Sequence, residues 1–177
     1  CPECSSEYIH YVGEGTEQLE IRLRDLLGGA RIGRIDRDTV RHIRDYERLL
    51  GQFRAGRLDV LVGTQMIAKG HDFPLVTLVG VIAADAALAL PDFRAAERTF
   101  QLLTQVAGRT GRGDAPGEVV IQSYFPNHYS CKLAATHRFE EFYAREVHFR
   151  KAMFYPPFTS LANVMVLERS NEKAKGL

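Results

Sequence analysis

The sequence Leu58-Asp59-Val60-Leu61-Val62, together with the later apolar run from Val76 to Ile82, decides the fold of this chain. Both runs are short and almost continuously apolar, without the alternation of a strand that has one side in water. Near-continuous apolar strands are typical of a parallel sheet that helices cover on both faces. The two runs therefore predict an α/β fold.

Helical and strand patterns alternate on either side of these runs. Thr16 can cap a first helix that ends at Gly28-Gly29, and its apolar residues recur at helical spacing: Leu19, Leu23, Leu26 and Leu27. A strand over 32–36 follows, and then a helix capped by Asp38 or Thr39, whose inward residues are Val40, Ile43, Leu49, Leu50 and Phe53. A helix over 94–107 and a strand over 118–122 complete an order that predicts a doubly wound parallel sheet over 16–125.

The pattern changes beyond Pro126. An aromatic-rich helix, which we expect to pack back on the sheet, carries Phe139, Phe142, Tyr143 and Phe149. The prolines Pro156-Pro157 end this helix, and an apolar strand over 161–167 follows. The predicted divisions are a connector over 1–15, the sheet domain over 16–125, a helical extension over 126–158 and the start of a C-terminal domain over 159–177.

Composition limits the classes of function. The 177 residues carry a formal charge of +1, so any contact with DNA must be local and not a general basic coat. The densest basic stretch, between Arg31 and Arg48, is interrupted by acidic residues, which favours a solvated helix face with internal ion pairs over the alternative of a DNA-binding track. Neither a leader sequence nor a run of about 18 uncharged apolar residues is present, so we expect a cytoplasmic protein with no membrane contact.

The ends of the chain and its cysteines suggest a piece of a longer protein. The sequence opens with Cys1 instead of Met and stops within a polar run. Cys1 and Cys4 form a Cys-x-x-Cys pair, which is as consistent with half of a four-cysteine zinc site as with a redox pair or coincidence. Cys131 is interpreted as a small apolar residue of the core.

Special residues follow the predicted strands, where parallel α/β sheets bind ligands. The first such segment is GTQMIAKGHDFP over 63–74, which is not a Walker A phosphate loop because Lys69 lies between alanine and glycine. Its Thr64 and Gln65 can hydrogen-bond a nucleic-acid backbone, and Asp72 can accept a hydrogen bond from a ribose hydroxyl. A polar connection that binds no ligand is the simpler alternative for this segment alone.

Two further segments carry arginines. In QVAGRTGR over 105–112, a helix cap would explain one glycine and one arginine, but not both Arg109 and Arg112, each of which follows a glycine. Paired guanidinium groups suit a phosphoryl group that is gathering charge, so this segment favours a function. In RIDRD over 34–38, Arg37 and its neighbours could contact DNA or cap the next helix, and the sequence alone favours the cap.

In this order the segments resemble motifs four, five and six of superfamily 2 helicases, with motif six in the form Gln-x-x-Gly-Arg-x-Gly-Arg. The strings DFRAAERTFQLLTQVAGRTGR and PGEVVIQS, with the flanking CPEC, YVGEGTE and YPPF, are similar to the replication-restart helicases of that superfamily. The resemblance implies a RecA-like second motor lobe of an ATP-dependent 3′ to 5′ DNA helicase. It also implies partners: forked and single-stranded DNA, primosome proteins and single-stranded-DNA-binding protein.

The resemblance also implies a role for each candidate residue. Arg109 and Arg112 would reach the phosphates of ATP, with Arg112 as the arginine finger, and Gln105 would link the nucleotide to the moving lobe. Gly70 and Asp72 would face the nucleotide, whereas Thr64 and Gln65 would face DNA. Arg37 is the third candidate for DNA binding, on its place after a predicted strand. ATP with Mg²⁺ would be bound mainly by a first lobe, and Cys1 and Cys4 would complete Zn²⁺ sites of a cysteine-rich insertion.

Two other classes of function compete with a motor. One is a scaffold whose own motor has decayed and which binds DNA forks and recruits a helicase loader. The pair of arginines, Arg109 and Arg112, argues against such decay. The other is a self-contained nucleotide-dependent enzyme, which conflicts with the lack of a phosphate loop or a Rossmann glycine fingerprint.

Overall fold

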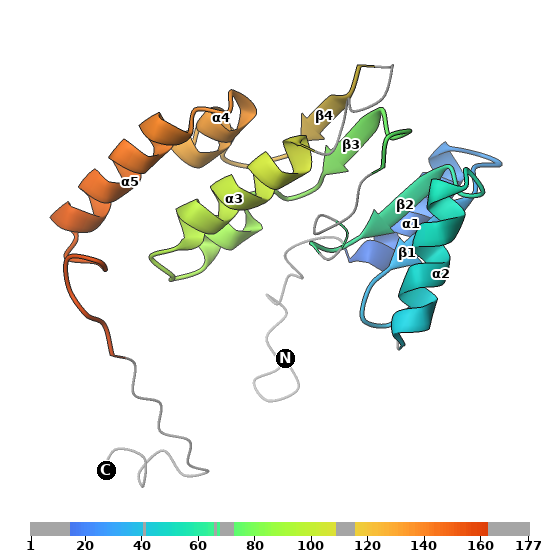
Figure 1. Cartoon of the computed structure of the whole chain (residues 1–177), viewed down its shortest axis with the longest axis horizontal. Coiled ribbons are helices and arrows are strands. Elements are labelled where there is room, and N and C mark those ends of the chain that lie inside the picture. Colours follow the sequence, from blue (N-terminus) through green and yellow to red (C-terminus); the bar gives the residue numbers. More distant parts are fainter. Residues whose placement is uncertain (1–14, 41, 66, 68–72, 109–115, 163–177) are drawn as a thin grey trace, which may run out of the picture. The chain divides into compact units, whose positions relative to one another are not determined.

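The computed structural model describes residues 15–40, 42–65, 67, 73–108 and 116–162 (Figure 1). The elements in chain order are α1 (Thr16–Leu26), β1 (Ile32–Ile35), α2 (Ile43–Arg54), β2 (Val60–Gly63), β3 (Leu78–Val81), the 3-10 helix η1 (Ala86–Ala89), α3 (Ala95–Ala107), β4 (Glu118–Ile121), α4 (Tyr129–Ala135) and α5 (Phe139–Ala152). They belong to two compact units, Cys1–Arg138 and Phe139–Leu177, which are described separately.

The first unit is built from two β-α-β connections, which confirms an α/β fold. Strands β1 and β2 are parallel, with Ile35 opposite Gly63, and α2 joins them. Strands β3 and β4 are also parallel, and η1 and α3 lie between them in the chain. The described strands pair as two separate two-stranded sheets, whereas the sequence predicted one continuous sheet. Apolar strands identify a parallel sheet, but the pattern carries no information on which strands are hydrogen-bonded neighbours.

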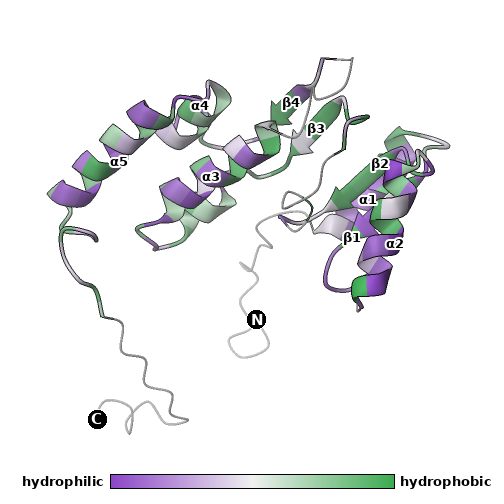
Figure 2. Ribbon diagram, viewed as in Figure 1, coloured by the Kyte–Doolittle hydropathy of each residue, from purple (hydrophilic) through white to green (hydrophobic). Residues whose placement is uncertain are grey.

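Burial around β1 follows the predicted pattern more closely than burial around β3 and β4. Ile35, Leu50 and Phe73 form a buried cluster against which the half-buried Leu49 and Phe53 pack. Figure 2 shows the hydrophobic residues of β2 and β3 in green. Leu78 and Val120, however, are exposed and project from the same face of the β3–β4 pair. The expectation that helices cover both faces is therefore wrong for this pair within the described residues.

The two helices beside β1 differ from prediction at their beginnings. Gly15, and not Thr16, is the N-cap of α1, because the Thr16 hydroxyl bonds to Asp36 instead. Helix α2 begins at Ile43 with His42 as its N-cap, because the backbone around Asp38 and Thr39 forms a separate turn.

Burial on these helices also departs from prediction. Ile43, which was expected to point inward, is exposed. Helix α1 ends before the glycine pair as expected, although Leu26 and Leu27 are exposed and the helix buries no residue.

Helix α3 agrees with its prediction to within one residue, and its N-cap is Arg94. It buries five side chains: Ala95, Thr99, Phe100, Leu103 and Val106. It packs against α4, which precedes the boundary of the unit and was not separated from the later aromatic helix in the sequence. No helix in the described ranges is long and apolar enough to cross a membrane.

The second unit contains α5. Of its aromatic residues, Phe142 is buried, whereas Phe139, Tyr143 and Phe149 are exposed. Glu146 is also buried, and its carboxylate accepts a hydrogen bond from Arg150 Nε at 2.8 Å. The strand predicted over 161–167 lies almost entirely outside the described residues.

Candidate functional site

The carboxyl ends of β1 and β2 bring the three predicted DNA-facing residues to one edge of the sheet. Because Ile35 is opposite Gly63 in a parallel pair, Arg37 and Thr64 follow these strands at the same end. Arg37, Thr64 and Gln65 are all exposed. This is the edge at which open α/β sheets bind ligands, so the geometry is suited to contact with an extended polar ligand.

Gly63 sets the path of the chain at this edge. A Cβ atom added to Gly63 would meet the backbone oxygen of Ile35 at 2.5 Å and would come closer still to the side chain of Ile67. The amide of Ile67 donates to the carbonyl of Thr64 at 3.1 Å, and its side chain packs against the buried cluster. The turn that carries Thr64 and Gln65 is therefore fixed by a close backbone approach and by an apolar anchor.

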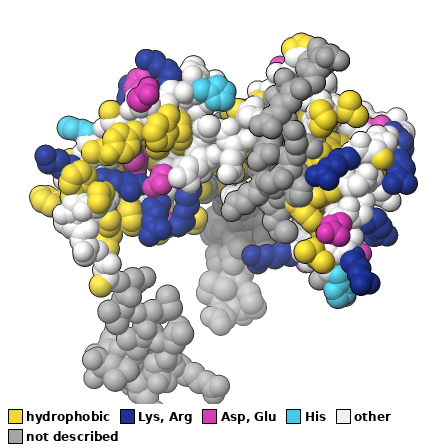
Figure 3. Space-filling model, viewed as in Figure 1, with side chains coloured by type: hydrophobic (Ala, Val, Ile, Leu, Met, Phe, Trp, Pro, Cys, Tyr) yellow, Lys and Arg dark blue, Asp and Glu magenta, His cyan; other side chains and the backbone are white. Residues whose placement is uncertain are grey.

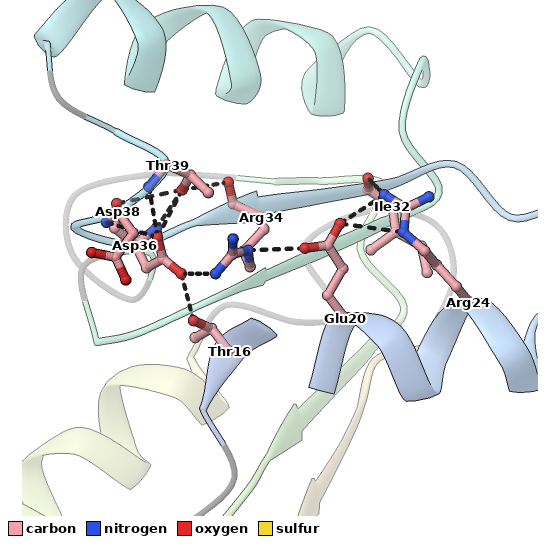
Figure 4. Close-up of polar contacts among 8 residues, drawn as sticks. All are labelled: Thr16, Glu20, Arg24, Ile32, Arg34, Asp36, Asp38 and Thr39. Atoms are coloured by element: carbon pink, nitrogen blue, oxygen red, sulfur yellow. Dashed lines mark hydrogen bonds and ion pairs between the residues drawn. The ribbon is translucent and has the colours of Figure 1, made fainter. Parts of the chain in front are cut away.

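Asp36 is the centre of a polar network at the same edge (Figure 4). It is only 6% exposed, and its Oδ2 accepts hydrogen bonds from Thr16 Oγ1 at 2.5 Å and from Arg34 Nη1 at 2.6 Å. Its Oδ1 accepts from the backbone amides of Asp38 at 3.0 Å and Thr39 at 2.8 Å. The carboxylate thus joins the start of α1 to the end of β1 and to the turn that follows.

The Asp36 carboxylate is held in its ionised form. Burial by itself would raise its pKa, but hydrogen bonds from Thr16 and Thr39 and the charge of Arg34 more than offset this effect. The net result is a pKa lowered to about 2. The sequence had suggested that Asp38 or Thr39 caps a helix here, and in the structure Asp36 organises a turn instead.

A second ion pair extends this network along α1. Arg34 Nε lies 2.9 Å from Glu20 Oε2, at ion-pair distance, although the N–H direction does not make it a hydrogen bond. Glu20 also accepts from Arg24 at 2.7 Å. Nothing in the sequence indicated this network, because Thr16 and Asp36 are 20 residues apart and no local pattern links them.

The described arginines of the basic stretch between Arg31 and Arg48 are exposed, except for the half-buried Arg34. Arg31 pairs with Asp59 at 2.5 Å, and Arg48 lies 3.7 Å from Asp45 on α2. In Figure 3, dark-blue and magenta side chains are interspersed over this part of the molecule. The interpretation as a solvated helix face with internal ion pairs is confirmed for Arg48 on α2, whereas Arg31 precedes β1 and pairs with Asp59 outside the stretch.

The nucleotide-facing candidates fall mostly outside the described residues. Gln105 is described, and its side chain is exposed on the last turn of α3. The candidates outside the described residues are Gly70, Asp72, Arg109, Arg112, Cys1 and Cys4. Within the described ranges no three His, Cys, Asp or Glu side chains are grouped as metal ligands would be.

The carboxyl ends of β3 and β4 hold a second buried carboxylate that the sequence did not single out. Asp85 is 4% exposed and accepts hydrogen bonds from Ser123 Oγ at 2.8 Å and from the amide of Phe125 at 2.7 Å. Burial opposes ionisation, but the bonds from Ser123 and the backbone lower the pKa of Asp85 overall. Asp85 therefore ties the ends of the two strands together.

Cys131 lies in α4 and is buried, with a free thiol. Burial raises the pKa of this thiol, so it is not activated as a nucleophile. These properties agree with the interpretation of Cys131 as a small core residue.

Comparison with known proteins gives the family. Residues 5–114 match the family described as the helicase conserved C-terminal domain. The chain is 52% identical over 174 residues to the replication restart protein PriA of Bacillus subtilis, covering 98% of this chain and 22% of that protein. It is 46% identical to PriA of Chlamydia muridarum, covering 97% of this chain and 23% of that protein. It is also 46% identical to PriA of Synechocystis sp., covering 98% of this chain and 21% of that protein.

The chain thus spans about a fifth to a quarter of the length of these relatives. Its similarity to them extends over nearly all of its own residues, including the sheet edge with Arg37, Thr64 and Gln65. The chain therefore belongs to the family of the helicase conserved C-terminal domain, and within it resembles the replication restart proteins PriA.

Proposed function

We propose that this chain is the second motor lobe of an ATP-dependent 3′ to 5′ DNA helicase that acts in replication restart and primosome assembly. In this proposal the lobe supplies helicase motifs four to six, belongs to a longer protein, and is inactive by itself. The observation that carries the proposal is the family match over 5–114 combined with the exposed polar residues that follow β1 and β2 at one edge.

The DNA-facing part of the proposal rests on residue chemistry at that edge. Thr64 and Gln65 offer hydroxyl and amide groups, and Arg37 offers a guanidinium group. These groups bind the sugar-phosphate backbone without reading the sequence of bases, which suits a motor that moves along any DNA. The turns that carry them are fixed by Gly63 and by Asp36, so little order has to be gained on binding.

The nucleotide-facing part rests on Gln105 and on the segment that follows it. The exposed amide of Gln105 lies on the last turn of α3, which buries five side chains, and fits contact with a nucleotide that is bound across a cleft. Arg109 and Arg112 come directly after this helix and would stabilise charge on the transferred phosphoryl group. Gly70 and Asp72 would contact the same nucleotide, and a first lobe would hold most of ATP and Mg²⁺.

The remaining parts of the proposal come from the relatives. Their printed name, replication restart protein, supports a role in replication restart. On the resemblance of the motifs we further propose the cytoplasm as the location and these partners: forked and single-stranded DNA, primosome proteins and single-stranded-DNA-binding protein. Cys1 and Cys4 would provide two thiolate ligands of a four-ligand Zn²⁺ site whose other ligands lie elsewhere.

A strand-displacement assay tests the proposal. The full-length protein should separate a duplex with a 3′ single-stranded tail when ATP and Mg²⁺ are present, and should fail on a duplex with a 5′ tail. The isolated chain should show neither strand separation nor ATP turnover. Tight binding to forked DNA without ATP turnover by the full-length protein would instead support the scaffold with a decayed motor.

A further inference from the structure

The backbone on both sides of Arg37 is held in place. Asp36 Oδ1 accepts the amides of Asp38 and Thr39 at 3.0 and 2.8 Å. Thr39 Oγ1 in turn accepts the amide of Asp36 at 3.0 Å. Arg37 thus projects an exposed side chain from a turn whose neighbouring peptide groups are fixed.

The same carboxylate fixes this turn to two other segments. Thr16 at the start of α1 donates to Asp36 Oδ2 at 2.5 Å, and Arg34 of β1 donates to the same oxygen at 2.6 Å. A carboxylate that accepts this many bonds has no freedom to rotate, so the turn cannot shift relative to β1 or to the start of α1.

Arg37 differs from Arg31 and Arg34 in its contacts with the described residues. Arg31 is paired with Asp59, and Arg34 is paired with Asp36 and Glu20. Among the residues that the structure describes, no carboxylate lies within ion-pair distance of Arg37. An unpaired guanidinium group on a fixed backbone is ready to meet a phosphate with little loss of conformational freedom.

We propose that Asp36 is a positioning residue, which together with Thr16 holds the turn that presents Arg37 to a phosphate of the DNA backbone. This inference rests on the proposed function, because it takes DNA as the ligand of the sheet edge. It goes further in assigning to a buried carboxylate, and to the first residue of α1, an effect on DNA affinity.

Asp59 provides a matched control at the opposite end of the same two strands. It precedes β2, and its carboxylate accepts bonds from the Arg31 backbone amide at 2.8 Å and from Arg31 Nε at 2.9 Å. Asp36 and Asp59 therefore both bind one arginine and at least one backbone amide beside β1 and β2. They differ in burial, since the Asp59 side chain is 44% exposed and that of Asp36 only 7%, and in position, since only Asp36 lies at the edge that carries Arg37.

The change of charge and the loss of positioning have opposite effects on DNA affinity. Replacing either carboxylate by an amide removes one negative charge, which should slightly strengthen attraction to DNA. Loss of positioning should weaken binding instead, because the amide group of asparagine would direct a donor toward Thr16 and Arg34. Weaker binding by Asp36→Asn thus cannot arise from the change of charge.

The experiment measures the dissociation constant of the full-length protein for single-stranded and forked DNA at several NaCl concentrations. The variants are Arg37→Gln, Asp36→Asn, the double variant and Asp59→Asn, each checked for folding by circular dichroism. Arg37→Gln should weaken binding about three- to tenfold and reduce the salt slope by about 0.7–0.9, as expected when one phosphate is no longer neutralised. Asp36→Asn should weaken DNA binding by a similar factor, and the double variant should weaken it little more than either single variant does. Asp59→Asn should not weaken DNA binding.

Two outcomes overturn different parts of the account. If Arg37→Gln leaves DNA affinity and salt slope unchanged, the assignment of DNA to this edge is wrong. If Arg37→Gln weakens binding but Asp36→Asn does not, or if the two effects add fully, the positioning role of Asp36 is wrong.

A second pair of variants keeps the test valid if Asp36→Asn fails to fold. Thr16→Ser retains the hydroxyl that donates to Asp36, whereas Thr16→Val removes it with little change in shape. The serine variant should bind DNA as the parent does. The valine variant should bind DNA more weakly and with a smaller dependence on NaCl concentration, while its KM for ATP stays unchanged. Equal DNA binding by both variants contradicts the proposal.

Discussion

At the scale of single residues, Asp36 stabilises the fold through its ionised form. Its pKa in the folded chain, about 2, lies below the usual value of 3.8. Because the folded-state pKa is depressed, the stabilisation is fully present above about pH 4 and is lost as the pH falls through about 2.

The lowered pKa of Asp36 leads to a prediction for unfolding in acid. The free energy of unfolding of the parent should exceed that of Asp36→Asn near neutral pH, by about 2–4 kcal/mol because the substitution disturbs a buried, hydrogen-bonded charge pair. The difference should narrow as the pH is lowered from about 5 to about 2. Urea unfolding at a series of pH values measures it, and a difference that stays constant would show that Asp36 does not titrate in this range.

Gly63 yields a second prediction at this scale. Alanine there would place a Cβ 2.5 Å from the carbonyl oxygen of Ile35, which is backbone and cannot rotate away. We expect Gly63→Ala to lower the free energy of unfolding by about 1–3 kcal/mol and to weaken DNA binding through Thr64 and Gln65.

Gly51 is the control for this substitution. It lies inside α2 with no atom within 4 Å of an added Cβ, so Gly51→Ala should stabilise the protein by about 0.5–1 kcal/mol. Thermal and urea unfolding of both variants provide the test. A Gly63→Ala variant as stable as the parent would mean that β1 and β2 approach less closely than described.

At the scale of elements, α1 and α3 are held in different ways. Helix α1 buries no side chain, and polar contacts from Thr16 and Glu20 link it to residues of β1 and the turn after it. Helix α3 buries five side chains. Local opening costs least where few apolar contacts are broken, so α1 should open more readily than α3.

Hydrogen exchange measures this difference. Amides of α1 should exchange faster than those of α3, and Glu20→Gln should accelerate exchange in α1 without changing it in α3. Glu20 is suited to this test because its ion pair with Arg34 is mostly shielded from solvent. Equal protection of the two helices would contradict the account of how α1 is attached.

The elements also show what the sequence can predict. The positions of β1, β2, α3 and β4 followed from apolar patterns, because these signals are local. The start of α2 was placed too early, since the side chain of Asp36 competes for the backbone amides of Asp38 and Thr39. The exposed Leu78 and Val120 could not be foreseen, because an apolar side chain does not specify its neighbour.

The candidate site was predictable to a similar degree. Thr64, Gln65 and Arg37 were identified because they follow strands, and the parallel register of β1 and β2 then brings them to one edge. The support beneath them was not predictable. Thr16, Glu20 and Asp36 meet only after the chain has folded, through contacts between residues distant in sequence.

At the scale of the whole molecule, the chain covers 22% of the Bacillus subtilis relative and contains no Walker A loop in its own sequence. Nucleotide turnover in our account therefore depends on a composite site to which this lobe contributes arginines. In the proposed mechanism, Arg109 and Arg112 would act on the transition state, where charge gathers on the transferred phosphoryl group, and would contribute little to the binding of DNA.

The most direct test is to measure DNA-stimulated ATP hydrolysis and fork affinity side by side for full-length Arg112→Ala and Arg112→Lys. The account predicts that Arg112→Ala lowers turnover by about 10³- to 10⁵-fold while fork affinity stays close to that of the parent. Arg112→Lys should restore little, because an ammonium group lacks the planar two-pronged geometry of guanidinium. Turnover by Arg112→Ala within about threefold of the parent would show that Arg112 is not the arginine finger.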